Sequence, residues 1–332
     1  MTLSCTDIQS KWSWQDWIGA LAVRLAFRRM HYSIEPGLYK LNSPNPDSPV
    51  FVSANYKLSF DHLRKALNSV SAWILVLDTK GINVWCAAGK GTFGTEELLN
   101  RLNAVRLPEK INHKQLIVPQ LGAPGVAAHH IQQHSGFRVI YGPVRAKDIP
   151  RFLDAELKAS PDMRRVQFNL VDRLAIVPVE MIGSISKAFL VALTFALIAS
   201  RRHGSWSWQH LYRLESLFAA LLMIVGFLQI SIMIPALLPW LPGRAFSVKG
   251  AVAGLLVWLF LLATRFYIQF ADLLTWLLLF MTIGSFMGLN LTGASTYTSL
   301  SGVKKEARLA VPWMIGGLLI GTGLWFWSCS KI

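Results

Sequence analysis

Cysteine is scarce in this chain. The 332 residues contain only three, Cys5, Cys86 and Cys329, and they lie far apart in the sequence. Disulfide frameworks and structural zinc sites need several cysteines at characteristic spacings, so both are excluded. We therefore expect Cys86 to be a reduced thiol in a cytosolic compartment.

Acidic residues are also few, with 18 Asp and Glu against 33 Lys and Arg and a formal net charge of +15. Before residue 177 no basic run is longer than a pair, and no nucleic-acid-binding module is recognisable. Nucleic acid is thus not an expected partner. Three arginines just ahead of the first long apolar run have the position of charges that flank a membrane anchor: Arg164, Arg165 and Arg173.

The first 30 residues lack the uninterrupted apolar core of a signal peptide, because Asp7, Asp16 and Arg24 break it. Between residues 14 and 30 the apolar side chains recur at helical spacing: Trp14, Trp17, Ile18, Leu21 and Leu25. The pattern predicts an amphipathic helix. Such a helix either packs on the following domain, its commoner role, or attaches to a membrane surface. A loop rich in Pro and Asn, 36–49, should follow it.

From residue 49 short apolar segments alternate with charged, helix-like segments. We expect strands at 50–54, 73–77, 116–118 and 137–141, and helices at 59–67 (with Ser59 as N-cap), from 95, after 124 and at 146–158. This alternation predicts a mostly parallel sheet covered by helices, an α/β Rossmann-like domain over 49–177 that follows an N-terminal helix and linker over 1–48. Such sheets bind ligands beyond the carboxyl ends of their strands.

Apolar runs dominate the remaining segment, 178–332, and the whole sequence has a positive mean hydropathy. Five runs approach the roughly 20 residues that a membrane helix needs: 182–200, 217–240, 251–270, 273–291 and 311–327. We predict an all-α transmembrane domain of five helices. Lys187, Pro235 and Arg265 fall near the predicted span ends, where kinks and snorkelling are tolerated.

The Lys and Arg residues that flank the five spans favour a cytoplasmic N-terminal domain, although Arg201 and Arg202 oppose it. We therefore expect a multi-pass protein of the inner, cytoplasmic membrane. Few ionisable residues lie in mid-span, which argues against a proton or ion pathway. The spans then serve either as an anchor or as a passage for an uncharged or thiol-bound species.

The segment from Lys80 to Gly94, K-G-I-N-V-W-C-A-A-G-K-G-T-F-G, surrounds Cys86 with small residues. Asn83 is a favoured N-cap residue, so we expect a short helix with Cys86 in its first turn and an end at Gly89 or Gly91. The positive helix terminus and Lys90, one turn further on the same face, favour the thiolate form of Cys86. Ala87 and Ala88 add little bulk, and such a surface suits a large, flat ligand.

This segment permits other interpretations. A lone cysteine is more often a small buried side chain. G-K-G-T lacks the spacing of a phosphate-binding loop, which excludes nucleotide hydrolysis. A cysteine nucleophile needs a histidine base, and four are available: His113, His129, His130 and His134. His130 and His134 share a helix face, but two ligands make only a weak metal site.

The segment G-I-N-V-W-C-A-A-G-K-G-T-F resembles the cap-helix signature of corrinoid proteins related to the corrinoid iron–sulfur protein. Its N-V-W-C-A-A-G-K form, followed by five spans, resembles the HgcA-type mercury methylation proteins. Further segments resemble that family: V-S-A-N-Y-K-L-S-F-D from Val52, L-V-L-D-T from Leu75, P-Q-L-G-A-P-G-V-A-A-H from Pro119 and G-F-R-V-I-Y-G-P-V-R-A from Gly136.

The resemblance implies a cobalamin-type corrinoid with Cys86 as the lower axial ligand of its cobalt. It further implies a cap helix against the corrin face, formed by Asn83, Val84, Trp85, Cys86, Ala87, Ala88, Gly89 and Lys90. The implied activity is transfer of a cobalt-bound methyl group to Hg(II), bound as a thiolate complex, to give methylmercury. The methyl donor would be a methylated folate or its methyltransferase, and a ferredoxin-like iron–sulfur protein would return cobalt to its reduced state.

A thiolate ligand suits this chemistry, because its electron donation helps the group opposite it to leave with its electrons. Two alternatives remain at this point. One is a corrinoid methyl carrier of one-carbon metabolism with a different acceptor. The other is a non-enzymatic membrane protein in which Cys86 binds a soft metal.

Overall fold

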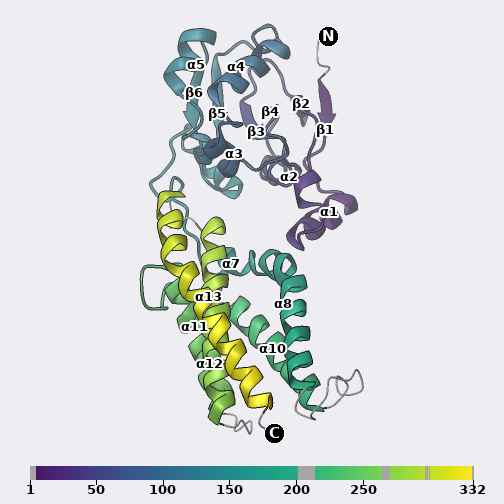
Figure 1. Ribbon diagram of the computed structural model, residues 1–332. Helices are drawn as coiled ribbons and strands as arrows, with labels where there is room; N and C mark the ends of the chain where they lie inside the picture. Colours follow the sequence, from purple (N-terminus) through teal and green to yellow (C-terminus); the bar gives the residue numbers. More distant parts are fainter. Residues whose placement is uncertain (1–4, 201–213, 264–269, 296–297, 299, 331–332) are drawn as a thin grey trace. The chain divides into compact units, whose positions relative to one another are not determined.

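The computed structural model describes residues 5–200, 214–263, 270–295, 298 and 300–330 (Figure 1). The chain divides into two compact units, Met1–Gln167 and Phe168–Ile332. The first is a mixed α/β domain, and the second is helical in its described residues. The sequence places the change in composition near residue 177, and the structure places the change in packing at Gln167.

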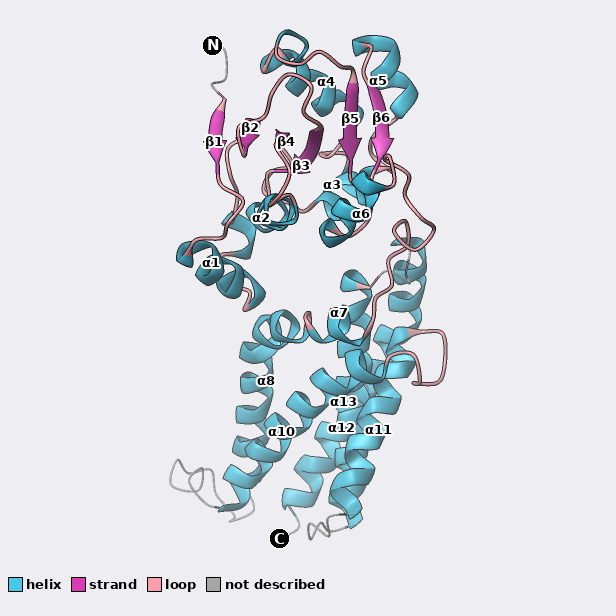
Figure 2. Cartoon of the chain, turned by 180° about the vertical axis from the view of Figure 1, so that it is seen from behind, coloured by secondary structure: helices cyan, strands magenta, loops and turns pink. Residues whose placement is uncertain are grey.

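The described strands of the first unit form one six-stranded sheet in the order β1-β2-β4-β3-β5-β6 (Figure 2). Strands β3 (Val50–Ala54), β4 (Ala72–Leu77), β5 (Gln115–Val118) and β6 (Arg138–Tyr141) run parallel, as the alternation predicts. Their order places a topological switch between β3 and β5, because the chain proceeds outward from β3 in both directions.

Two further strands extend the sheet beyond the prediction. β2 (Gly37–Leu41) pairs antiparallel with β4, and β1 (Thr6–Ile8) pairs with β2. The loop predicted for 36–49 is therefore wrong over β2, which is short and lies between prolines and asparagines. The segment 1–48, predicted as a helix and linker, also supplies two strands to the sheet.

Alternation of side chains along the strands divides the core into two layers. Val52, Leu75 and Leu77 face α3 (Val84–Lys90), α4 (Thr95–Ala104) and α5 (Ala128–Ser135). Phe51, Ile74 and Val76 face α2 (Lys57–Ala66) and α6 (Ile149–Asp154). Because successive residues of a strand point to opposite faces, these strands are buried on both sides and contain continuous apolar runs.

Two helix predictions need correction. Tyr56, not Ser59, is the N-cap of α2, because the helix begins one turn earlier than predicted. The helix predicted for 146–158 is a 3-10 turn, Ala146–Asp148, followed by α6, which ends at Asp154. Pro150 lies in the first turn of α6, where its missing N–H costs no helical hydrogen bond.

The N-terminal amphipathic helix, α1 (Trp14–Arg24), is shorter than predicted. A capping box starts it: the Ser13 side chain accepts from the Asp16 amide, and the Asp16 carboxylate accepts from the Ser13 amide. It ends at Leu25, and Ala26 and Arg28 follow with positive φ. Its apolar side packs on the domain less than expected, because Trp14 and Leu21 are exposed. Trp17 is also exposed, but its ring contacts Trp12 and the Lys65 ammonium of α2.

Among its described residues, the second unit has five helices long and apolar enough to cross a membrane, in agreement with the sequence. They are α8 (Val177–Ser200), α10 (Leu214–Leu237), α11 (Phe246–Ala263), α12 (Phe270–Leu291) and α13 (Leu300–Ser330), preceded by the short α7 (Leu170–Leu174). Lys187 lies inside α8 rather than near its end, because the helix begins five residues earlier than the predicted span. Five basic residues used to predict orientation or snorkelling lie outside the described part of the chain: Arg201, Arg202, Arg213, Arg265 and Lys331.

Glycines allow α11 and α12 to approach closely. A side chain at Gly250 would collide with the Gly284 carbonyl, and one at Gly254 would collide with the Phe280 carbonyl. Gly288 faces α11 in the same way, at the Phe246 carbonyl. Small residues at four-residue spacing are a common means of helix packing in lipid, where contact between backbones replaces hydrophobic burial.

Candidate functional site

Cys86 lies in the first turn of α3, the short helix that follows strand β4. Asn83 is the N-cap, with extended backbone, and its side-chain oxygen accepts from the Cys86 amide at 2.9 Å. Gly91 ends the helix in the left-handed conformation, at φ 82°, which favours glycine. The predicted cap and helix end are confirmed, with Gly91 rather than Gly89 as the terminal glycine.

The side chains of α3 divide cleanly between the core and the surface. Val84, Ala87 and Ala88 are buried against the sheet, whereas Trp85, Cys86, Gly89 and Lys90 are exposed. No atom lies within 4 Å of the position that a side chain at Gly89 would take. The surface beside the thiol is therefore low and open, and Cys86 is not the buried side chain of the alternative interpretation.

A buried polar cluster holds the loop between β4 and α3. The Asn55 side-chain oxygen accepts from the Thr79 amide at 3.1 Å, the Thr79 hydroxyl at 2.8 Å and the Gly81 amide at 3.0 Å. The Thr79 hydroxyl also lies 2.6 Å from the Ile82 carbonyl oxygen, one residue before the cap. Asn55 and Thr79 thus position α3. The sequence alone did not single out either residue, although both lie in segments that resemble the mercury methylation proteins.

Glycines let the loop after α3 pack against the loop after β5. A side chain at Gly125 would collide with the Phe93 carbonyl, and one at Gly122 would meet the Phe93 ring. Thr95 links the same loops, because its hydroxyl accepts from the Ala127 amide at 2.9 Å. These contacts fix the C-terminal end of α3, so the helix is held at both ends.

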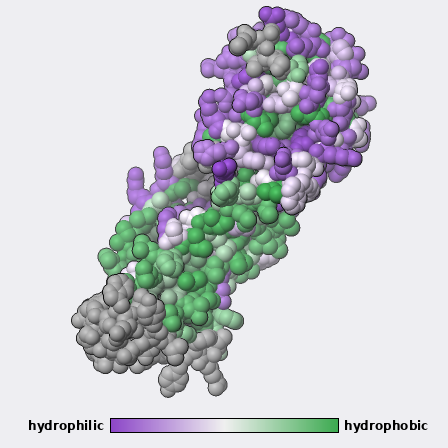
Figure 3. Space-filling view, turned by 90° about the vertical axis from the view of Figure 1, so that its right-hand side faces the viewer, coloured by the Kyte–Doolittle hydropathy of each residue, from purple (hydrophilic) through white to green (hydrophobic). Residues whose placement is uncertain are grey.

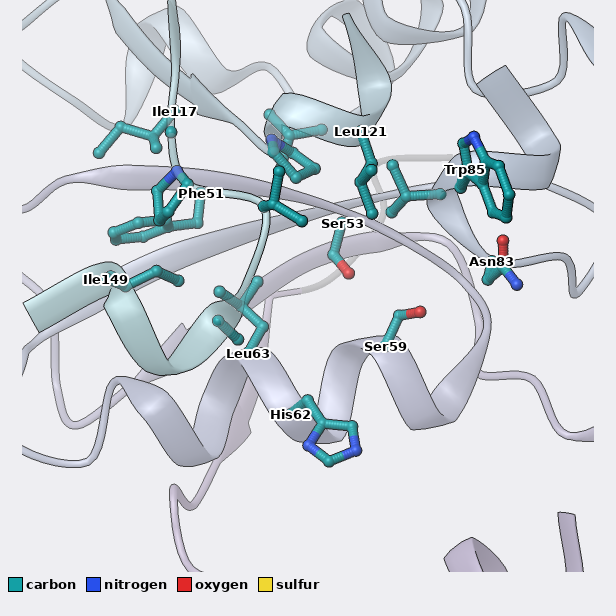
Figure 4. Close-up of a pocket in the computed structure, with 17 residues that line it drawn as sticks. Phe51, Ser53, Ser59, His62, Leu63, Asn83, Trp85, Ile117, Leu121 and Ile149 are labelled. Carbon is teal, nitrogen blue, oxygen red and sulfur yellow. The ribbon is translucent and has the colours of Figure 1, made fainter. Parts of the chain in front are cut away.

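A cavity of about 340 Å³ lies at the carboxyl ends of β3, β5 and β6, beside the start of α3. Asn83, Val84 and Trp85 line it, and Cys86 follows them on the open surface. Figure 4 shows apolar side chains, including Phe51 and Ile149, at one end, and Asn83 and Trp85 at the other. The cavity lies beside the switch between β3 and β5, where sheets of this topology bind ligands.

Polar side chains from β3 and α2 also line this cavity. Ser53 and Ser59 contribute hydroxyls from opposite walls, and His62 lies one turn beyond Ser59 (Figure 4). Partial loss of hydration lowers the pKa of His62, and the nearby charge of Arg24 lowers it further. The segment from Val52 to Asp61 contains both serines, but nothing in the sequence separated them from the core residues beside them.

The histidines considered as partners of Cys86 have other contacts. His113 precedes β5, at the opposite edge of the sheet, and its ring nitrogens contact the Ser48 carbonyl and the Gln115 amide. The His134 ring contacts the His130 carbonyl, and the centroids of the His130 and His134 rings lie 5.9 Å apart. Within the described residues no group of three His, Cys, Asp or Glu side chains is placed to hold a metal ion.

The exposed side of α3 has the properties that a large, flat cofactor needs: a soft thiol ligand, small neighbours and open space at Gly89. The adjoining turn, Gln120–Gly122, packs against α3, and the side-chain oxygen of Gln120 is buried without a hydrogen-bond partner among the described residues. A corrinoid carries peripheral amides that can donate to such an acceptor. The residues present therefore fit a corrinoid.

The first unit is thus an α/β domain with an exposed cysteine on a capped helix. The chain continues from it into membrane-type helices. Residues 28–153 match the protein family described as "CO dehydrogenase/acetyl-CoA synthase delta subunit". The matched segment contains α3, the cavity and four parallel strands, and ends before the helical unit.

Individual proteins are also similar to this part of the chain. The acetyl-CoA decarbonylase/synthase complex subunit gamma of Archaeoglobus fulgidus is 32% identical over 128 residues, 38% of this chain and 27% of that protein. Its counterpart from Methanopyrus kandleri is 29% identical over 125 residues, 37% of this chain and 27% of that protein. The corrinoid/iron-sulfur protein large subunit of Moorella thermoacetica is 29% identical over 126 residues, 37% of this chain and 28% of that protein.

The first unit is therefore similar in sequence to gamma subunits of acetyl-CoA decarbonylase/synthase complexes and to the large subunit of a corrinoid/iron–sulfur protein. The chain spans only about a quarter of the length of these relatives, as the 27% and 28% coverages show.

Proposed function

We propose that this protein is a membrane-anchored, corrinoid-dependent methyltransferase that transfers a methyl group to Hg(II). The observation that carries the proposal is the exposed Cys86 thiol on the capped helix α3, beside a cavity at the strand ends. In this proposal the first unit is a Rossmann-like corrinoid-binding domain that faces the cytoplasm. The five helices of the second unit hold it at the inner membrane.

The residues of α3 would share the work of holding the corrinoid. Cys86 would be the protein's ligand to the cobalt, and Trp85, Gly89 and Lys90 would hold the corrinoid from the exposed side of the helix. Val84, Ala87 and Ala88 anchor the helix in the core. Asn83 orients the first turn through its bond to the Cys86 amide. Such support of a metal ligand commonly tunes the metal it holds.

When bound, the corrinoid would carry the methyl group between donor and acceptor. The protein's part is electronic and steric. A thiolate at Cys86 would donate electron density to the bound metal. A Hg(II) thiolate complex is an electrophile that would take the methyl group and release a thiolate.

Electrons for the metal would come from another protein. An iron–sulfur cluster usually takes four cysteine thiolates, and these 332 residues contain three cysteines in distant parts of the chain. The resemblance to mercury methylation proteins implies a ferredoxin-like iron–sulfur protein, which is the proposed reductant. A methylated folate, or the methyltransferase that uses it, is the proposed methyl donor.

The experiment compares the purified full chain with two cysteine variants. We expect the unchanged protein to contain cobalt, to have the absorbance of a corrinoid and to methylate Hg(II) when reduced and given a methyl donor. Cys86→Ala should abolish methyl transfer and leave the fold intact, because Ala87 and Ala88 rather than Cys86 anchor the helix. Cys5→Ser, which changes a thiol far from α3 in the sequence, should retain activity. Full activity of Cys86→Ala would refute the axial-ligand role.

A second variant tests the electronic argument. Cys86→His should retain the corrinoid but transfer methyl more slowly, because imidazole donates less charge than thiolate. An equal rate in the two proteins would contradict that argument without affecting the assignment of the site.

A second candidate function is a corrinoid methyl carrier whose acceptor is not mercury. The relatives favour it, because their names place them in an acetyl-CoA decarbonylase/synthase complex. Assays of the same methyl-loaded protein with Hg(II) and with a thiol acceptor separate the two. Absence of cobalt from the purified protein would instead support a soft-metal-binding protein.

A further inference from the structure

The helix α1 presents its apolar face away from its own domain. Trp14, Ile18 and Leu21, on successive turns, are 76%, 47% and 59% exposed. Trp17 and Leu25 share that face and are also exposed, and Phe27 follows in the turn after the helix. The residues that pack inward are Asp16, Ala20 and Val23. This arrangement reverses the usual one, in which the apolar side of a surface helix covers the core.

Buried ion pairs fix α1 in this orientation. The Asp16 carboxylate lies 2.6 Å from the Arg64 guanidinium and also pairs with Lys57, both on α2. The Trp12 indole donates to the Asp61 carbonyl at 2.9 Å. Burial opposes ionisation of Asp16, but the bonds from Lys57, Ser13 and Arg64 outweigh it and lower the pKa of the carboxyl. Rolling the apolar face inward would break these charged contacts, so the exposed face is a stable feature.

The charge around this face is positive. Between residues 11 and 29 the basic residues are Lys11, Arg24, Arg28 and Arg29, all exposed, and the one acidic residue is Asp16, which is buried. Tryptophans on one face with arginines toward the end of the helix are typical of helices that lie in the interface of an anionic membrane.

We propose that α1 lies in the headgroup region of an anionic bilayer and tethers the first unit to the membrane surface. The tryptophans of the exposed face suit the boundary between water and lipid. The five spans of the same chain keep a bilayer within reach, so a modest intrinsic affinity suffices for attachment. This tether is independent of the proposed function, because no cavity-lining residue belongs to α1.

The test uses the full chain in lipid nanodiscs, with a fluorescent label on a single cysteine. In a background with all three native cysteines replaced by serine, Leu21→Cys places the label on the exposed face of α1. Asn103→Cys, at an exposed position of α4, is the matched control. Spin-labelled headgroup lipids report contact with the bilayer surface, iodide reports contact with water, and thermal unfolding checks that both proteins are folded.

We expect lipid quenching at position 21 to exceed that at position 103 several-fold, and to increase when phosphatidylglycerol replaces phosphatidylcholine. Changing Arg24, Arg28 and Arg29 together to Gln should reduce the dependence on phosphatidylglycerol. Equal iodide access at both positions in every lipid would overturn the proposal. Protection from iodide without lipid quenching would also overturn it, because another part of this chain, a second copy or a partner protein would then cover the face.

Discussion

The two units treat apolar side chains in opposite ways. Ile74, Leu75 and Leu77 in the sheet are completely buried, whereas Phe189 and Leu319 on the helices of the second unit are more than 60% exposed. The surface colouring makes the same contrast, with a largely hydrophilic first unit and a largely hydrophobic second one (Figure 3). The difference reflects the solvent, because lipid does not penalise exposed hydrocarbon. The helix α1 belongs to the first unit but has a surface of the second kind.

The units also differ in what holds their helices. Ion pairs of Asp16 with Lys57 and Arg64 join α1 to α2 in the first unit, and Asp61 pairs with the same two residues within α2. Close approach at glycines joins α11 to α12 in the second. Substitutions at the charged contacts and at the glycine contacts should therefore have effects of different size on stability.

The largest effect is expected at the glycine contact. Gly254→Leu should prevent correct packing of α11 on α12, because the new side chain meets the Phe280 carbonyl. Gly316→Leu, on α13, is the control, because no atom lies within 4 Å of the new side chain's first carbon. Yield and thermal unfolding in detergent should fall sharply for the first variant only. Similar behaviour of both would show that the glycine contact does not hold the bundle.

The next effect is expected at the buried charges of the first unit. Asp61→Asn removes the partner that lies 2.7 Å from Lys57 and 2.9 Å from Arg64, and the Asp61 side chain is 1% exposed. Among the described residues, Asp16 would then be the only carboxylate paired with Lys57 and Arg64, and this loss of buried negative charge should lower the free energy of unfolding by about 3 kcal/mol. Lys80→Gln, which breaks the exposed pair with Asp78, should change stability little. Denaturant unfolding checks both, and equal losses would contradict the distinction between buried and exposed pairs.

Acid should weaken the same network. The pKa of Asp16 is lowered from its ordinary value of 3.8, so the unfolded chain binds a proton at higher pH than the folded one. Stability from this group is complete above about pH 4 and is lost as the pH falls toward the folded pKa. Unfolding measured at successive pH values below 4 should show this loss. Asp16→Asn should be less stable at neutral pH and show a smaller acid dependence, and an unchanged dependence would assign the effect to other carboxylates.

The smallest effect is expected at the cap of α3. Asn83→Ala removes the bond to the Cys86 amide and should cost about 1 kcal/mol. Ser59→Ala is the comparison, because Ser59 is not the N-cap of α2. Amide hydrogen exchange over residues 84–90 should accelerate for the first variant and stay unchanged for the second. Unchanged exchange in both would show that Asn83 does not hold the helix start.

Much of the fold was predictable because its signals are local. Continuous apolar runs identified β3 and β4, and run length identified five membrane-type helices. β2 was missed because five residues among prolines and asparagines resemble a loop until β4 supplies their hydrogen bonds. The start of α2 was misplaced because Ser59 has the composition of a cap, whereas Tyr56 precedes the first helical turn without any side-chain bond.

The candidate site divides in the same way. Asn83, Cys86 and Gly91 were predictable, because a cap, a first turn and a terminal glycine are properties of adjacent residues. Asn55 and Thr79 were not predictable, because they are 24 positions apart in the sequence and their hydrogen bond joins the ends of two strands. The serines of the cavity also come from separate elements, β3 and α2.

For this protein, the sequence alone determined that short apolar strands in the first part of the chain are followed by long apolar helices in the second. It also determined a capped helix with Cys86 in its first turn and an amphipathic helix near the N-terminus. Each follows from the period or order of neighbouring side chains. Only the tertiary structure decided which way that helix faces, because burying Asp16 between Lys57 and Arg64 holds its tryptophans outward. The same assembly of distant segments places Cys86 on an open surface beside a cavity, a position that no local pattern specifies.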